Sequence, residues 1–104
     1  MNAYYADHFV LPLPEGHSFP MAKYRLLRDA LASGAAGDVR LLEAPAASDG
    51  ELALAHEPGY ISAIAEGTAS AAQMREIGFP WSPRMVERAR RSVGATIAAA
   101  RDAL

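Results

Sequence analysis

In the stretch LPLPEGHSFPMAKYRLLRDAL, residues 11–31, a proline-rich segment leads directly into an amphipathic helix. Pro12 and Pro14 lack a backbone N–H and interrupt both helices and strand ladders, so residues 8–19 are predicted to form an irregular loop. His17 lies between these prolines and the helix. Its position raises the question of whether this histidine takes part in chemistry or only belongs to the segment that delivers the chain into the helix.

The helix that follows is predicted to run from Pro20 to Gly34. Proline suits the first helical position, because the N–H that it lacks would have no partner inside the helix. Apolar side chains then recur at helical spacing and form one stripe: Tyr24, Leu27 and Leu31. Gly34 follows where a left-handed residue would end the helix.

Two short strands and four further helices are predicted along the chain. The strands are the aromatic segment 3–6 and the segment 38–44, which Pro45 ends. Residues 48–51 and 70–73 have the Ser-x-x-Glu/Gln form of a capping box, which marks a helix start. The predicted helices after residue 44 cover ELALAH (51–56), PGYISAIAEG (58–67), AAQMREI (71–77) and the segment 83–104.

The last of these helices, 83–104, is the longest, and Ser82 is placed to cap it ahead of Pro83. Its apolar stripe consists of Val86, Ala89, Val93, Ile97, Ala100 and Leu104. The helix reaches the last residue without a C-terminal capping signal, and two short strands do not make a stable sheet alone. We therefore expect residues 1–104 to be an incomplete domain.

The composition is that of an ordinary folded domain, with 51% hydrophobic and 21% charged residues. The net charge of −2 provides no basic field, so we expect no nucleic-acid partner. There is no cysteine, which excludes disulfides and thiolate chemistry. No signal-peptide pattern and no membrane-spanning run are found. We expect no membrane partner and a bacterial, cytoplasmic protein.

Candidate chemical groups are few. The three histidines, His8, His17 and His56, are too far apart to place two on one face of an element, so no metal site and no catalytic group are assigned. The cluster ERARR, residues 87–91, is interpreted as a solvated helix face rather than a nucleic-acid surface, because the total charge is acidic.

Three longer segments carry a resemblance. They are YYADHFVLPLPEGHSFPMAKYRLLRDAL (4–31), LLEAPAASDGELALAHEPGYISAIAEG (41–67) and IGFPWSPRMVERARRSVGATIAAARDAL (77–104). In this order they resemble the N-terminal segment of the histone deacetylase superfamily, with the bacterial and class IV-like branch as the nearest likeness. The likeness extends over essentially all of residues 1–104.

The resemblance implies an α/β parent fold of the deacetylase/arginase type, a parallel sheet flanked by helices, of which this chain is the mostly helical N-terminal part with one or two short strands. It also implies a zinc-dependent amidohydrolase whose substrate is N-acetyl-lysine or a small acetyl amide. The zinc ligands and catalytic residues of the family match no residue here. Zinc is therefore expected in the full-length parent, and this chain alone is expected to hold no cofactor and to be inactive.

Two segments are matched residue by residue. The segment GHSFPMAKY, residues 16–24, corresponds to one in which many family members keep a basic residue near the floor of the active-site tunnel. Lys23 would take that place and is the better candidate for the substrate or product channel. His17 is the second candidate, but it has no convergent partner residues, so a structural or orienting role is favoured for it. In AHEPGYI, residues 55–61, several deacetylases carry an aspartate that binds the substrate backbone. Pro58 stands at that position here, and the adjacent Glu57 is not a matched residue.

Two functional hypotheses of different classes follow. In the first, the chain is the N-terminal segment of a deacetylase-like hydrolase. In the second, it is a stand-alone helical interaction module that forms a homo-oligomer through the exposed apolar face of helix 83–104. Light scattering separates them, since the second requires an oligomer whose population rises with concentration.

Overall fold

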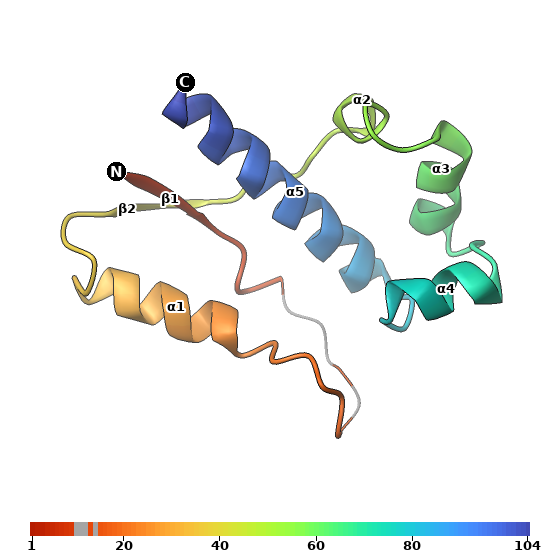
Figure 1. The fold of residues 1–104 in the computed structure, drawn as a ribbon, viewed down its shortest axis with the longest axis horizontal. Coiled ribbons are helices and arrows are strands. Elements are labelled where there is room, and N and C mark those ends of the chain that lie inside the picture. The colour runs from red at the N-terminus through yellow and green to blue at the C-terminus, as the bar shows by residue number, and fades with distance from the viewer. Residues whose placement is uncertain (10–12, 14) are drawn as a thin grey trace.

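The computed structural model describes residues 1–9, 13 and 15–104. Within these residues it contains two strands and five helices (Figure 1). In chain order they are β1 (Asn2–Tyr5), α1 (Lys23–Ala32), β2 (Arg40–Glu43), α2 (Asp49–Leu52), α3 (Pro58–Glu66), α4 (Ala71–Ile77) and α5 (Pro83–Ala103). The predicted architecture, mostly helical with one or two short strands, is confirmed. Pro12 and Pro14, on which the predicted loop rested, lie outside the described residues.

The two strands pair in parallel, with Ala3 opposite Leu41 and Tyr4 opposite Leu42. A parallel pair requires a crossover, and α1 lies in that connection (Figure 1). The ladder extends by one hydrogen bond beyond β2, from the Ala44 N–H to the Tyr5 carbonyl oxygen at 2.8 Å. The observed strands are close to those predicted.

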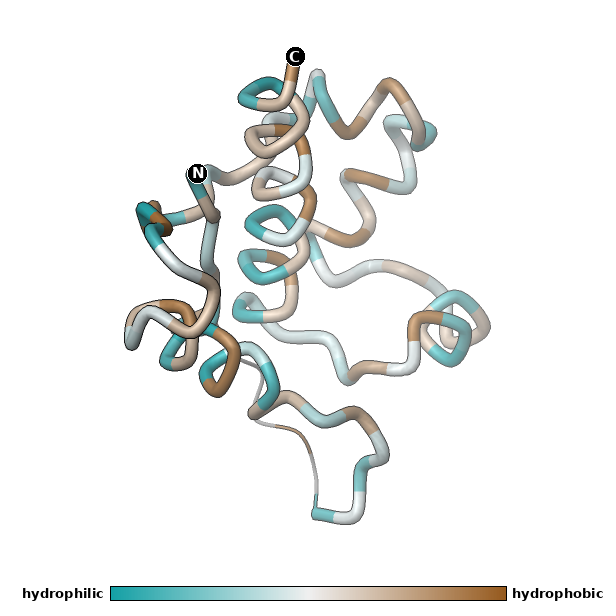
Figure 2. Tube along the Cα trace, turned by 60° about the vertical axis from the view of Figure 1, so that its left-hand side comes forward, coloured by the Kyte–Doolittle hydropathy of each residue, from teal (hydrophilic) through white to brown (hydrophobic). Residues whose placement is uncertain are grey.

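Helix α5 covers the strand pair on one side. It packs against β1, and it lies between the strands and the helices α2–α4 in both Figures 1 and 2. Near its C-terminus, the Tyr4 hydroxyl of β1 donates a hydrogen bond of 2.6 Å to the Asp102 carboxylate. The Asn2 side-chain amide donates to the same oxygen at 3.0 Å. Two side-chain hydrogen bonds thus connect β1 to the last turn of α5.

Helix α1 differs from its prediction. It begins at Lys23 rather than Pro20, because Pro20 accepts a hydrogen bond from the Lys23 N–H at 3.1 Å in a turn that precedes the helix. Gly34 has the expected left-handed backbone, with φ of 90°. The apolar stripe is only partly covered, since Leu27 is 59% exposed.

The remaining helix starts follow the local sequence. Both capping boxes form, through Ser48 with Glu51 and through Ser70 with Gln73. The Ser82 hydroxyl accepts from the Met85 N–H at 3.0 Å and caps α5, as predicted. Helix α2 is shorter than its prediction, because the chain leaves the helix in a turn after Leu52.

The tightest packing lies between α5 and the segment that connects β2 to α2. Gly94 is buried against the backbone of Pro45, and the Ala47 N–H donates to the Arg90 carbonyl oxygen at 2.9 Å. The Arg91 guanidinium donates to the Ala44 carbonyl oxygen at 2.9 Å. This contact fixes the connection along the middle of α5.

Little of the rest is buried. Among the described residues, the buried apolar side chains are Ala44, Ala47 and Met85. The molecule is a slab of 45 × 36 × 17 Å, and Figure 2 shows hydrophobic and hydrophilic residues alternating along its helices. The helices therefore form a thin layer around α5 instead of enclosing a deep core.

Candidate functional site

The imidazole of His17 joins the segment before α1 to the end of α4. The Phe19 N–H donates to Nδ1 at 3.1 Å, which places the ring proton on Nε2. Nε2 lies 3.1 Å from the Gly78 carbonyl oxygen and donates to it. Gly78 is the left-handed C-cap of α4, so the histidine binds at the point where the chain turns towards α5. Both ring nitrogens are therefore used in structural hydrogen bonds.

Three aromatic rings surround Arg88 of α5, and one of them, Phe79, also stacks on His17. The His17 ring stacks on Phe79 with centroids 5.8 Å apart, and Phe19 meets Phe79 edge-on at 5.2 Å. The Arg88 carbon Cζ lies 5.4–5.5 Å from the centroids of Phe19, Tyr24 and Phe79. We call the set His17, Phe19, Lys23, Tyr24, Phe79 and Arg88 the aromatic–cation cluster.

Arg88 also makes a directed contact in this cluster. Its guanidinium Nη2 donates to the Tyr24 hydroxyl at 3.1 Å. Cation–π attraction to three rings and this hydrogen bond together hold the start of α1 against the N-terminal half of α5. Arg88 is thus the residue through which α5 positions the segment 17–24.

Lys23 is the first residue of α1, and its side chain extends over the same rings. Nζ lies 4.7 Å from the Phe19 centroid and 5.2 Å from the Tyr24 centroid. No carboxylate of the described residues lies within ion-pair distance of Nζ. The structure therefore brings Lys23 and His17, the two residues predicted for the channel, into one cluster in which both contact Phe19. A channel role for either stays a prediction.

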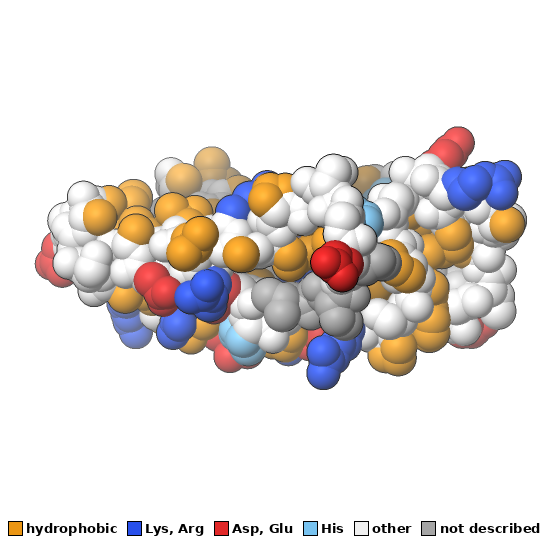
Figure 3. Space-filling view, turned by 90° about the horizontal axis from the view of Figure 1, so that it is seen from below, with side chains coloured by type: hydrophobic (Ala, Val, Ile, Leu, Met, Phe, Trp, Pro, Cys, Tyr) orange, Lys and Arg blue, Asp and Glu red, His pale blue; other side chains and the backbone are white. Residues whose placement is uncertain are grey.

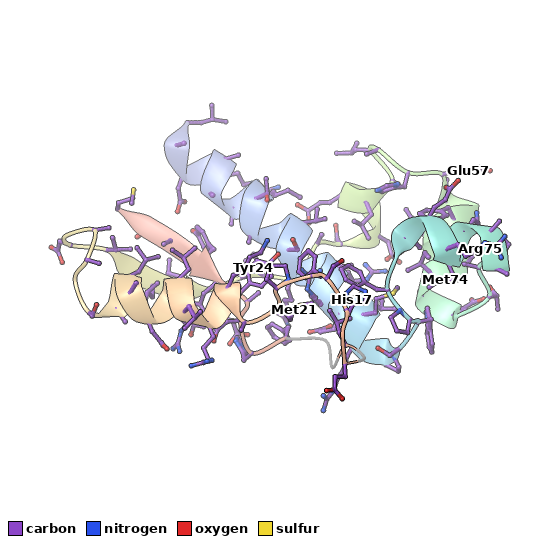
Figure 4. The ribbon with its side chains drawn as sticks, turned by 60° about the horizontal axis from the view of Figure 1, so that its bottom comes forward. His17, Met21, Tyr24, Glu57, Met74 and Arg75 are labelled. Carbon is purple, nitrogen blue, oxygen red and sulfur yellow. The ribbon has the colours of Figure 1, made fainter. Side chains whose placement is uncertain are left out.

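Other residues singled out in the sequence lie elsewhere. His8 approaches the Glu43 carboxylate at 3.4 Å, and His56 contacts Tyr60 with ring centroids 5.7 Å apart. Glu57 is the exposed N-cap residue of α3 and makes no capping hydrogen bond through its side chain. Figure 4 shows His17 and Tyr24 near the centre of the molecule and Glu57 at its α3–α4 end.

The described part of the chain does not fit a zinc site. No three of its His, Cys, Asp or Glu side chains gather closely enough to hold a metal ion. We therefore assign no zinc-dependent chemistry to the described residues.

The interpretation of residues 87–91 as a solvated face is wrong for its arginines. The Arg90 and Arg91 side chains are only 21% and 23% exposed. Arg90 donates to the Ala47 carbonyl oxygen at 3.1 Å and to the Asp49 carboxylate at 2.6 Å. The total charge of a chain does not indicate which arginines bind backbone carbonyls or aromatic residues. The contacts of Arg90, Arg91 and Arg88 could therefore not be predicted from it.

Comparisons with known proteins agree with this architecture. Residues 17–104 match the histone deacetylase domain. The chain is also 40% identical over 101 residues to an uncharacterized protein of Picosynechococcus sp.. That alignment covers 96% of this chain and 34% of the relative, so the chain spans about a third of the relative's length.

The matched domain has an α/β, arginase-like fold, and its family is typically zinc-dependent. The parallel strand pair and the helices around it are compatible with that fold. Among the described residues, no helix has the length and apolar character needed to cross a membrane. Since the match extends over most of the sequence, from the aromatic–cation cluster to the end of α5, the chain belongs to the histone deacetylase domain family.

Proposed function

We propose that this chain is the N-terminal segment of a deacetylase-like amidohydrolase, which hydrolyses N-acetyl-lysine or a related small acetyl amide in the whole protein. The observation that carries the proposal is the match of residues 17–104 to the histone deacetylase domain. The covered third of the Picosynechococcus relative supports the view that residues 1–104 form an incomplete domain.

Within such an enzyme, this segment supplies part of the wall around substrate or product. Lys23 carries a positive charge above two aromatic rings, a position from which it would attract an acetate anion. His17 acts as a positioning residue, because its two hydrogen bonds hold the loop that precedes Lys23. Water activation and proton transfer belong to residues outside this chain.

The test uses three proteins in an assay of acetate release from an acetyl-lysine peptide. They are the 104-residue chain, the Picosynechococcus relative, and a chimera in which this chain replaces the matched stretch of the relative. We expect no release by the chain alone and release by both longer proteins. In the chimera, Lys23→Ala lowers kcat/KM and Lys23→Arg restores most of it. A relative that releases no acetate from acetyl-lysine or from small acetyl amides contradicts the proposal.

Metal content is a second measurement on the same proteins. The chain alone is expected to hold no stoichiometric zinc, because its described residues offer no group of three ligands. One tightly held zinc per 104-residue chain in elemental analysis would contradict this expectation.

Self-association through the 83–104 helix is the second candidate function. Val93, in the apolar stripe of α5, is 38% exposed, which favours a partner on that face. Light scattering over a range of concentrations tests this candidate, and a monomer at all concentrations contradicts it.

A further inference from the structure

An apolar groove separates α5 from helices α2–α4 and has a volume of about 280 Å³. We call it the α3–α5 groove. Its apolar lining includes Tyr60, Ile61 and Ile64 of α3, Ile77 of α4, and Val86 and Val93 of α5. Neither Ile64 nor Val93 is buried, so the apolar side chains form an open surface rather than a closed core.

The charged groups at the edge of this groove are already engaged. The Arg88 guanidinium donates to Tyr24, and Arg90 binds Ala47 and Asp49. Apart from these two arginines and His56, whose ring lies against Tyr60, the lining of the groove is apolar. A surface that covers the groove is therefore expected to be apolar and uncharged, because a charge placed there would lose its hydration without gaining a partner.

The exposed area of the chain exceeds that of a compact protein of its size. A folded monomer of this mass has an accessible surface of about 5,700 Å², whereas this chain has 6870 Å². Its radius of gyration is 15.2 Å, whereas about 13 Å is typical of a domain of this length. The excess of roughly 1,200 Å² is larger than the ~800 Å² that each partner contributes to a stable interface.

The length of the relative indicates what covers this surface. The chain corresponds to 34% of that protein, so most of the relative lies outside the matched stretch. We propose that the α3–α5 groove binds the part of the deacetylase domain that these 104 residues do not supply, through an apolar helix or strand of that part. This inference rests on the proposed function and identifies the face at which the two parts of the domain meet.

A second apolar face provides the matched control. On α1, Leu26 and Leu27 are 58% and 59% exposed, and they are not among the residues that line the groove. Apolar side chains, orange in Figure 3, are scattered over the visible surface, so exposure alone does not distinguish the two faces. A substitution on each face does.

The experiment measures binding of the 104-residue chain to the purified part of the Picosynechococcus relative that lies outside the matched stretch. Isothermal titration calorimetry is expected to give a 1:1 complex. Val93→Asp on α5 and Ala65→Asp on α3 each place a charge in the groove at a position that is already partly exposed, and each is expected to weaken binding at least tenfold. Leu26→Asp on α1 is expected to leave the affinity unchanged. Circular dichroism confirms that each variant keeps its helices.

Three results would overturn the proposal. They are the absence of a complex, a complex that neither groove variant weakens, and a homodimer of the chain that both groove variants dissociate, which would make a second copy the occupant. Acetate release by the complex is recorded separately. A groove-dependent complex that does not deacetylate supports the docking surface and contradicts the proposed function, so the two failures are distinguishable.

Discussion

Gly94 of α5 lies directly against the carbonyl group of Pro45, and a Cβ atom at position 94 would overlap the Pro45 oxygen. The close approach also allows the Ala47 N–H to reach the Arg90 carbonyl oxygen at 2.9 Å. A helical glycine is here required by the neighbouring backbone rather than by its own dihedral angles.

Gly94→Ala is expected to destabilise the chain despite the higher helix propensity of alanine. Relief of the overlap requires α5 to move away from residues 44–47, with a cost of about 1–3 kcal/mol in the free energy of unfolding. Urea denaturation followed by the fluorescence of Trp81 measures the change. Gly59→Ala in α3 is the control, since a Cβ at position 59 meets no atom within 4 Å. Equal or higher stability of Gly94→Ala would show that the contact is not tight.

Arg88 offers a second test, this time of the aromatic–cation cluster. Arg88→Met keeps the length and apolar character of the side chain but removes the hydrogen bond to Tyr24 and the contacts to the three rings. We expect a loss of roughly 1–2 kcal/mol, with faster amide exchange in residues 17–24. Arg84→Met, at an exposed position of the same helix, is the control. Unchanged exchange in residues 17–24 would contradict the positioning role of Arg88.

The local parts of this fold could be predicted from the sequence, because they depend on neighbours in the chain. A capping box needs a serine and a carboxylate or amide three residues later, and both predicted boxes form. The start of α1 could not be predicted in the same way. Pro20 is compatible with a first helical turn. However, its carbonyl oxygen accepts a hydrogen bond from the Lys23 N–H in a separate turn, so the helix begins three residues later.

The candidate site depends on contacts between distant residues. His17 and Gly78 are 61 positions apart, and Tyr24 and Arg88 are 64 apart. The resemblance of the sequence to deacetylases singled out His17 and Lys23, but it did not indicate Arg88. Phe19 and Tyr24 lie at the start of α1, and Phe79 lies between α4 and α5. The position of these aromatic residues close to helix ends was the signal that could have suggested a shared cluster.

The cap of the longest helix provides a third test. Ser82→Ala removes the acceptor of the Met85 N–H and is expected to cost about 1 kcal/mol, whereas Ser82→Asp keeps an acceptor and most of the stability. Chemical denaturation measures both values. Ser92→Ala, at an exposed position inside the same helix, is the control and is expected to be neutral or slightly stabilising. Equal stabilities of Ser82→Ala and Ser82→Asp would contradict the capping role.

The hydrogen bond between the Tyr4 hydroxyl and the Asp102 carboxylate predicts that the stability of the chain depends on pH. The hydrogen bond from the Tyr4 hydroxyl, followed by that from Asn2, lowers the pKa of Asp102. A lowered pKa means that the stabilisation is present above the ordinary pKa of the carboxyl group and is lost as pH falls through the lowered value. The same hydrogen bond is the main reason that the pKa of Tyr4 is raised, so its contribution is lost as pH rises through that raised value. This hydrogen bond therefore stabilises the chain at neutral pH, between the lowered pKa of Asp102 and the raised pKa of Tyr4.

Tyr4→Phe removes the shorter of the two hydrogen bonds to the Asp102 carboxylate and leaves the one from the Asn2 side chain. We expect the pKa of Asp102 to rise towards its ordinary value and the last turn of α5 to exchange its amides faster at neutral pH. Nuclear magnetic resonance titration of the Asp102 carboxyl carbon and hydrogen exchange of residues 100–104 measure the two effects. Tyr5→Phe is the matched control, because the ring of Tyr5 lies against Arg28 and His8 instead. If Asp102 titrates identically in Tyr4→Phe and in the unchanged chain, the hydrogen bond does not hold the strand to the helix in solution.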